Sequence, residues 1–120
     1  MKKVILKGSV PVDQYFSQPA TFKVMVHMGV TYAKTLNQSN IQNNNNKFYI
    51  LQILQNETNP NNIILFTRWG RVGVEGQHAE IPCGSPDAAI HQFSQKLRAK
   101  LGGGYREVEM NYDADEKELR

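Results

Sequence analysis

Alternating apolar and polar positions predict two strands near the start of the chain. Residues 21–26 alternate in this way, and residues 30–36 repeat the pattern. A period of two residues is that of a half-buried β-strand. Met28 and Gly29 lie between the two stretches and suit a tight turn, so we expect the stretches to pair as a hairpin.

The longest apolar stretches lie in the middle of the chain. Residues 47–55 have apolar side chains on both faces of a predicted strand, and residues 62–68 have the same pattern. Such strands are typical of the centre of a sheet that is covered on both sides. We expect Gly70 and Gly73 to end the second strand. Residues 77–83 predict a further short strand.

A helix is predicted from Ser85 onward. Serine is a favoured N-cap, and Pro86 and the acidic Asp87 suit the first turn. An apolar stripe follows at Ile90, Phe93, Leu97 and Leu101, before three glycines. The stripe is expected to pack on the sheet. Residues 105–112 predict a final strand or an extended pass across the sheet, so the predicted fold is α+β.

Residues 37–46 are almost wholly polar and include six asparagines. A low-complexity linker is one interpretation. Because the stretch is short and lies between predicted strands, we expect instead an ordered polar loop at one edge of the sheet. Asparagine tolerates turn conformations and hydrogen-bonds its own backbone, which favours such a loop.

Length and composition indicate one globular domain. The chain has 120 residues, of which 40% are hydrophobic and 21% charged. We expect an irregular N-terminal segment at 1–20, the folded domain at 21–112 and an acidic tail or linker at 113–120. The single cysteine excludes an internal disulfide and a multi-cysteine zinc site. No stretch approaches the length of a membrane span, so no membrane partner is expected.

The charge is unevenly distributed along the chain. Residues 1–112 carry 12 basic and 7 acidic side chains, a net charge of +5. A net positive charge over these residues is compatible with nucleic-acid binding, and equally with an ordinary solvated surface. Three cations lie near the predicted end of the helix, at Lys96, Arg98 and Lys100. They suit nucleic-acid binding, and they equally offset the helix dipole.

Motifs of catalysis are missing from the sequence. It contains no nucleophile motif, no P-loop and no dinucleotide-binding glycine pattern. The three histidines share no metal-ligand spacing with Cys83. The chain is therefore interpreted as a binding module, and no cofactor or metal is expected in it.

The only tryptophan, Trp69, lies between Arg68 and Arg71. A buried core residue is the default interpretation of a tryptophan. However, glycines remove bulk beside it, and buried charges are rare unless they are paired. A solvent-exposed aromatic ring between arginines suits stacking on a sugar or base, with guanidinium groups bound to phosphate. Lys47 and the asparagines at 43–46 enter the adjacent end of the sheet.

The segment Arg68-Trp69-Gly70-Arg71-Val72-Gly73, followed by Gly76-Gln77, resembles the signature of the WGR domain of DNA-dependent poly(ADP-ribose) polymerases. The resemblance covers about residues 6–113. It includes the stretches 36–40 and 44–54, the helix, and Asn111-Tyr112-Asp113. It implies a small antiparallel β-sheet with one long α-helix packed across it, in agreement with the pattern.

The resemblance also implies a function in DNA repair in the nucleus. WGR domains bind DNA nicks and ends. By residue-to-residue correspondence, Trp69 packs on a ribose or base, while Arg71 and Asn46 hold the 5′-phosphate. The other DNA-binding candidates are Lys47, Lys100, Gln77 and, more weakly, Arg68, which strand alternation places on the opposite face. Implied partners are the regulatory and NAD-using catalytic domains of an ADP-ribosyltransferase.

Two departures from the family pattern affect these expectations. Tyr105 stands where the family often has a tryptophan, and the segment that follows is short. Regulatory helices and a catalytic domain are not among these residues. We expect either a domain of a longer protein or a stand-alone WGR protein.

Two other functions remain compatible with the sequence. The chain is alternatively a protein-interaction module that contacts an ADP-ribosyltransferase without strong DNA binding. A weaker alternative is binding of RNA or single strands through the same residues. DNA binding should weaken steeply with salt, whereas an apolar protein contact should not.

Overall fold

The computed structural model describes residues 10–40, 42 and 45–108. The acidic tail expected at 113–120 and the far end of the expected last strand lie outside these residues. Within the described part of the chain, no helix is long and apolar enough to cross a membrane.

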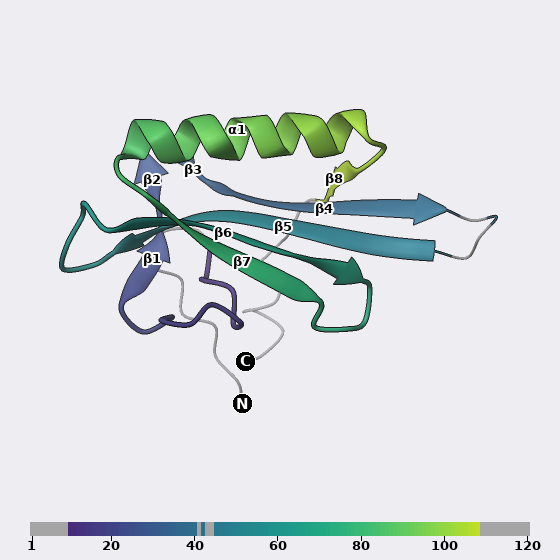
Figure 1. The fold of residues 1–120 in the computed structure, drawn as a ribbon, viewed down its shortest axis with the longest axis horizontal. Helices are drawn as coiled ribbons and strands as arrows, with labels where there is room; N and C mark the ends of the chain where they lie inside the picture. The colour runs from purple at the N-terminus through teal and green to yellow at the C-terminus, as the bar shows by residue number, and fades with distance from the viewer. Residues whose placement is uncertain (1–9, 41, 43–44, 109–120) are drawn as a thin grey trace.

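An antiparallel β-sheet with one long helix across it forms the fold, which confirms the predicted α+β class (Figure 1). The main sheet has the order β7-β6-β5-β4-β8, with β1 also paired to β5. The strands are β1 Phe22–Val24, β2 Val26–His27, β3 Val30–Thr31, β4 Ala33–Asn40, β5 Asn45–Asn56, β6 Ile63–Arg71, β7 Gln77–Cys83 and β8 Arg106–Val108. The helix α1 spans Pro86–Gly102.

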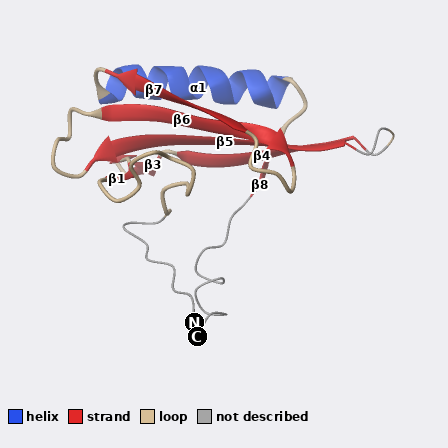
Figure 2. Cartoon of the chain, turned by 60° about the horizontal axis from the view of Figure 1, so that its bottom comes forward, coloured by secondary structure: helices blue, strands red, loops and turns tan. Residues whose placement is uncertain are grey.

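Both faces of the sheet are covered, as the apolar pattern of β5 predicts. On one face, Leu51 and Ile53 pack with Phe93 of α1. On the other, Leu54 and Phe66 pack with Phe16 of the N-terminal segment. Figure 2 shows the helix on one side of the sheet and the loops of the N-terminal segment on the other. We call these the helix face and the N-terminal face.

The N-terminal segment, in the part that the structure describes from residue 10, is irregular but belongs to the core. Residues 10–21 contain no strand. Phe16 is nevertheless only 2% exposed. Its ring centre lies 5.0 Å from that of Phe22 and 5.8 Å from that of Phe66, edge to face in both cases. These residues therefore fold together with the sheet.

The predicted hairpin of residues 21–36 is correct only at its tip. Val26 pairs with Thr31, and Met28 and Gly29 form the turn with positive φ angles. Away from the tip, β1 and β4 do not pair with each other and instead both pair with β5. The long apolar strand offers each of them more buried contacts than a two-stranded hairpin would.

Two other boundaries differ from the prediction. The expected polar loop at 37–46 is mostly strand, because β4 continues to Asn40 and β5 begins at Asn45. The backbone ladder does not depend on apolar side chains once its register is set. Likewise β6 passes through Gly70 and ends at Arg71.

The helix begins as the sequence predicts. The Ser85 hydroxyl accepts a hydrogen bond from the backbone N–H of Ala88 at 3.1 Å, which caps the N-terminus. Phe93 is 3% exposed, whereas Leu101 is 44% exposed, so the predicted apolar stripe stops before the last turn. The helix packs against β5, β6 and β7.

Candidate nucleic-acid interface

The strand register brings the signature residues to one face of the sheet. Trp69 lies directly opposite Tyr49 on one side and Gln77 on the other, and Arg71 lies opposite Lys47. Residues directly opposite each other in an antiparallel sheet share a face. All of these side chains are therefore on the helix face.

Trp69 is neither fully buried nor free. It is partly buried and packs against the helix-face core. Its ring centre lies 6.1 Å from that of Tyr49, with the ring planes tilted by 32°. Trp69 is thus anchored in the core while keeping accessible surface, and its stacking on a sugar or base stays a prediction.

Lys100, near the end of α1, lies over the same aromatic group. Its Nζ is 4.6 Å from the ring centre of Tyr49 and 5.5 Å from that of Tyr105. A cation over a ring face is attracted to the π electrons. Burial raises the pKa of the Tyr49 phenol above its ordinary 10.0, so that phenol stays neutral beside the ammonium. We call Trp69, Arg71, Gln77, Lys47 and Lys100 the Trp69 cluster.

The glycines after α1 set the place of Tyr105. The Gln38 side chain of β4 donates to the backbone oxygen of Gly103 at 2.8 Å. Gly104 has a φ of +99°, and a Cβ there would lie 2.9 Å from the Gln38 amide nitrogen. The absence of a side chain at Gly104 thus lets the chain turn closely against β4, and it brings Tyr105 to within 6.2 Å of Tyr49, ring centre to ring centre.

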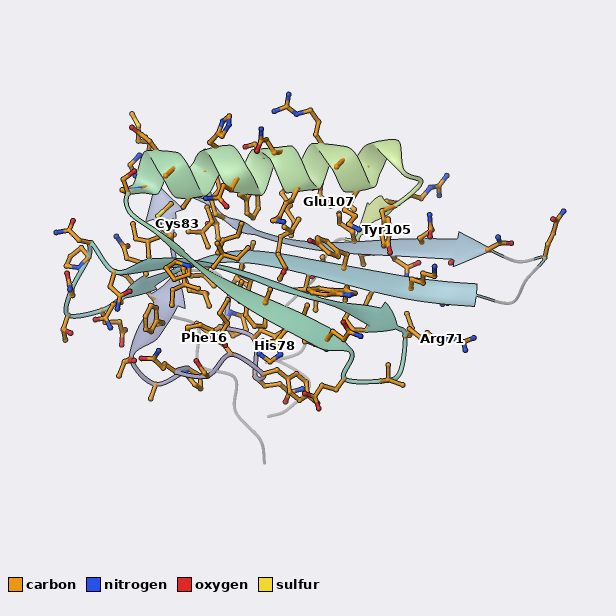
Figure 3. The ribbon with its side chains drawn as sticks, viewed as in Figure 1. Phe16, Arg71, His78, Cys83, Tyr105 and Glu107 are labelled. Atoms are coloured by element: carbon orange, nitrogen blue, oxygen red, sulfur yellow. The ribbon has the colours of Figure 1, made fainter. Side chains whose placement is uncertain are left out.

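Positive charge gathers at the open end of the Trp69 cluster. Lys47 and Arg71 are exposed at the ends of their strands, and Gln77 is exposed beside them. Figure 3 shows the Arg71 side chain extending from the end of the sheet. Guanidinium and ammonium groups beside an accessible ring can bind a phosphate while the ring stacks.

Arg68 lies on the N-terminal face, as alternation along β6 predicts. Its Nη2 is 3.1 Å from Oδ2 of Asp13, and these side chains are 12% and 7% exposed. Its Nη1 donates to the backbone oxygen of Glu75 at 2.7 Å. Nothing in the structure tests whether Arg68 binds DNA, but the site that we propose leaves it out.

The Asn46 side chain, like that of Arg68, lies on the N-terminal face, whereas Arg71 lies on the helix face. Its side-chain oxygen accepts hydrogen bonds from Asn37 at 3.0 Å and from Ser39 at 3.1 Å, both on the N-terminal face. The backbone oxygen of Asn46 accepts from the N–H of Val72 at 2.8 Å. The expectation that Asn46 and Arg71 hold one phosphate remains a prediction, and it requires a ligand that reaches around the strand end.

Gly70 and Gly76 allow a close approach of backbone to backbone. A Cβ on Gly70 would lie 2.9 Å from the Gly76 Cα. A Cβ on Gly76, which has a φ of +79°, would lie 2.1 Å from the Trp69 carbonyl oxygen. The loop after Arg71 therefore folds directly against the strand that carries Trp69.

The sequence predicts the residues of the Trp69 cluster but not the contacts of Trp69 and Lys100 with the Tyr49 ring. Tyr49 appears in the sequence only as one more apolar position of a central strand. Tyr105 appears only as a departure from a family pattern. Their contact depends on the register of β5 and on the turn after α1. Within the described residues, no cluster of His, Cys, Asp or Glu side chains could hold a metal ion.

Among known protein families, the model of the WGR domain matches residues 32–112 of this chain. The curated relatives agree. Poly(ADP-ribose) polymerase 2 of Zea mays is 35% identical over 94% of this chain and 20% of its own length. Poly(ADP-ribose) polymerase 2 of Homo sapiens is 34% identical over 91% of this chain and 19% of its own length.

A second kind of relative matches a shorter stretch. The human protein mono-ADP-ribosyltransferase PARP3 is 42% identical over 63% of this chain and 14% of its own length. The chain thus spans about a fifth or less of these relatives.

Proposed function

The chain belongs to the WGR domain family, and we propose that it is a module that binds DNA strand breaks through the 5′-phosphate. The observation that carries this proposal is the Trp69 cluster. It combines a partly exposed indole with Arg71, Lys47 and Lys100 at one end of the sheet. The relatives are named poly(ADP-ribose) polymerases or a protein mono-ADP-ribosyltransferase, so we propose that the module regulates such an enzyme in the nucleus.

The mechanism is led by phosphate contacts. The cationic side chains attract the DNA backbone, and each phosphate that they neutralise releases counterions. The exposed part of Trp69 then stacks on a ribose or base at the break, where the duplex is interrupted. Contacts to phosphate and sugar position a protein on DNA but carry no sequence information. Binding is therefore expected to depend on DNA structure rather than on sequence.

A second role has its own support. Val72 and Val74, in the loop that follows Arg71, are 52% and 56% exposed. Exposed apolar side chains next to a proposed ligand site suit contact with another protein domain. We propose that a regulatory or catalytic domain of the ADP-ribosyltransferase contacts this loop while DNA occupies the Trp69 cluster.

Fluorescence anisotropy with three matched DNAs tests the module's function. A nicked duplex, a continuous duplex of the same sequence and the single strand are titrated at several salt concentrations. The nicked duplex should bind most tightly, with a steep loss of affinity as salt rises. Equal binding of nicked and continuous duplex would contradict break recognition. Preference for the single strand would favour the single-strand alternative.

A further inference from the structure

A largely buried ion pair joins distant parts of the chain on the N-terminal face. Nε of Arg68 lies 3.2 Å from each carboxylate oxygen of Asp13, and Nη2 lies 3.1 Å from Oδ2. Nη1 points elsewhere and donates to the Glu75 backbone oxygen at 2.7 Å. The planar fork of an arginine can make these contacts simultaneously, whereas the single ammonium of a lysine cannot reproduce them.

Asp13 is itself fixed. Its Oδ1 accepts a hydrogen bond from the backbone N–H of Tyr15 at 2.9 Å. The backbone N–H of Asp13 donates to Gln52 of β5 at 3.0 Å, and the Gln52 amide donates to the Pro11 oxygen at 3.2 Å. Gln52 is only 5% exposed. The backbone at Pro11 and Asp13 is therefore tied to the centre of the sheet through Gln52, and the Asp13 carboxylate links the same segment to Arg68 of β6.

Aromatic rings further restrict the Arg68 guanidinium. Its central carbon lies 4.7 Å from the ring centre of Tyr15 and 5.0 Å from that of Phe48. To reach a DNA phosphate, Arg68 would have to leave an ion pair, a backbone carbonyl and two rings. Its contacts suit a structural role rather than a ligand contact.

The segment held by Arg68 connects members of the Trp69 cluster. Glu75 belongs to the loop at residues 72–76, which begins directly after Arg71 and ends directly before Gln77. Within that loop, the N–H of Val74 donates to the Arg71 oxygen at 3.2 Å. The next residue, Gly76, lies against the Trp69 backbone. The hydrogen bond to Glu75 therefore holds the loop that connects Arg71 to Gln77.

We propose that Arg68 and Asp13 are positioning residues, which set the arrangement of the Trp69 cluster from the opposite face of the sheet. Through them, the N-terminal segment determines how well the cluster distinguishes a 5′-phosphate. The proposal rests on the DNA-binding function proposed above. It differs from a direct contact of Arg68 with DNA, for which Arg68 was the weaker candidate in the sequence.

The substitution Asp13→Asn distinguishes a positioning role of Asp13 from a purely electrostatic one, because the two predict opposite changes in DNA binding. Removing a negative charge strengthens attraction to DNA if only electrostatics matter. If Asp13 positions the cluster, the same change loosens the loop and lowers phosphate discrimination. Asp87→Asn is the matched control, because it makes the same charge change at an exposed position at the far end of α1. Arg68→Lys keeps the positive charge but loses the fork.

Two readouts are measured for each variant. One is the fluorescence emission of Trp69 without DNA, which is specific because the chain has one tryptophan. The other is the ratio of Kd values for nicked duplexes with a 5′-hydroxyl and with a 5′-phosphate. Asp13→Asn and Arg68→Lys should both shift the emission and lower this ratio about three- to tenfold, a usual size for coupling between positions. Asp87→Asn should change neither.

Unchanged emission and an unchanged ratio in Arg68→Lys would overturn the proposal. So would tighter binding of both DNAs by Asp13→Asn with wild-type emission. Thermal melting identifies a variant that fails to fold; if Asp13→Asn does so, Arg68→Lys carries the test. If the wild type does not discriminate between the two DNAs, the proposed function fails, and Trp69 emission alone decides the positioning role.

Discussion

The ammonium of Lys100 lies 4.6 Å from the centre of the Tyr49 ring, so the last turns of α1 are joined directly to the strand partner of Trp69. This contact holds a positive charge at a defined place beside the indole. It makes Lys100 a fixed part of the site rather than one of several interchangeable cations at the end of a helix.

Lys100→Gln should therefore weaken binding of nicked DNA and flatten its salt dependence. The loss of one phosphate contact reduces the slope of log K against log salt by about 0.9. Anisotropy titrations at four salt concentrations measure this slope. Arg98→Gln, at an exposed position in the same part of α1, is the control. Equal losses in both variants would indicate general attraction to the helix end instead of a specific contact.

Trp69→Leu should lose stacking while keeping most of the apolar anchor. We expect a loss of about 1–3 kcal/mol in binding free energy, the usual contribution of stacking one base on an aromatic side chain. Trp69→Phe, which retains a ring, should lose less. Urea denaturation of both variants separates binding effects from loss of fold. Wild-type affinity in the leucine variant would show that the indole does not stack on DNA.

Gly76→Ala should destabilise the domain. The added Cβ would collide with the Trp69 carbonyl oxygen, and the φ of +79° is strained for any residue with a side chain. A cost of at least about 1–3 kcal/mol in the free energy of unfolding follows. Gly84→Ala is the control, because a Cβ there meets nothing within 4 Å. Equal stability of the two variants would mean that the loop does not lie against Trp69 as described.

Phe16→Ala should destabilise the domain by about 3–5 kcal/mol, the usual cost of truncating a buried phenylalanine. Phe16 is 2% exposed and packs on two other rings. Gln14→Ala, at an exposed position of the same segment, should have little effect. Chemical denaturation measures both. A small loss in Phe16→Ala would show that the N-terminal segment is peripheral to the fold.

Local pattern was sufficient to predict much of this fold. The two apolar faces of β5 predict a sheet covered on both sides, and Ser85-Pro86-Asp87 predicts where α1 begins. The remaining features of the fold depend on which strands pair with each other. The sequence around Met28 favours a hairpin, but β1 and β4 both pair with β5 beyond its tip. The pattern of a single strand does not specify its partner.

The candidate site shows the same division. Alternation along β6 is enough to place Arg68 and Trp69 on opposite faces. The partners of these residues were not predictable, because Asp13 lies 55 positions from Arg68 in the sequence. Nor does any local signal place Lys100 over Tyr49, since that contact depends on how far α1 extends across the sheet.

The most direct test of the proposed break recognition concerns Arg71 and the 5′-phosphate. Kd values are measured for two nicked duplexes that differ only in a 5′-phosphate or a 5′-hydroxyl at the nick, with the wild type and with Arg71→Gln. We predict that the wild type binds the phosphorylated nick more tightly and that Arg71→Gln loses most of this preference. Equal affinities of the wild type for both duplexes would contradict it.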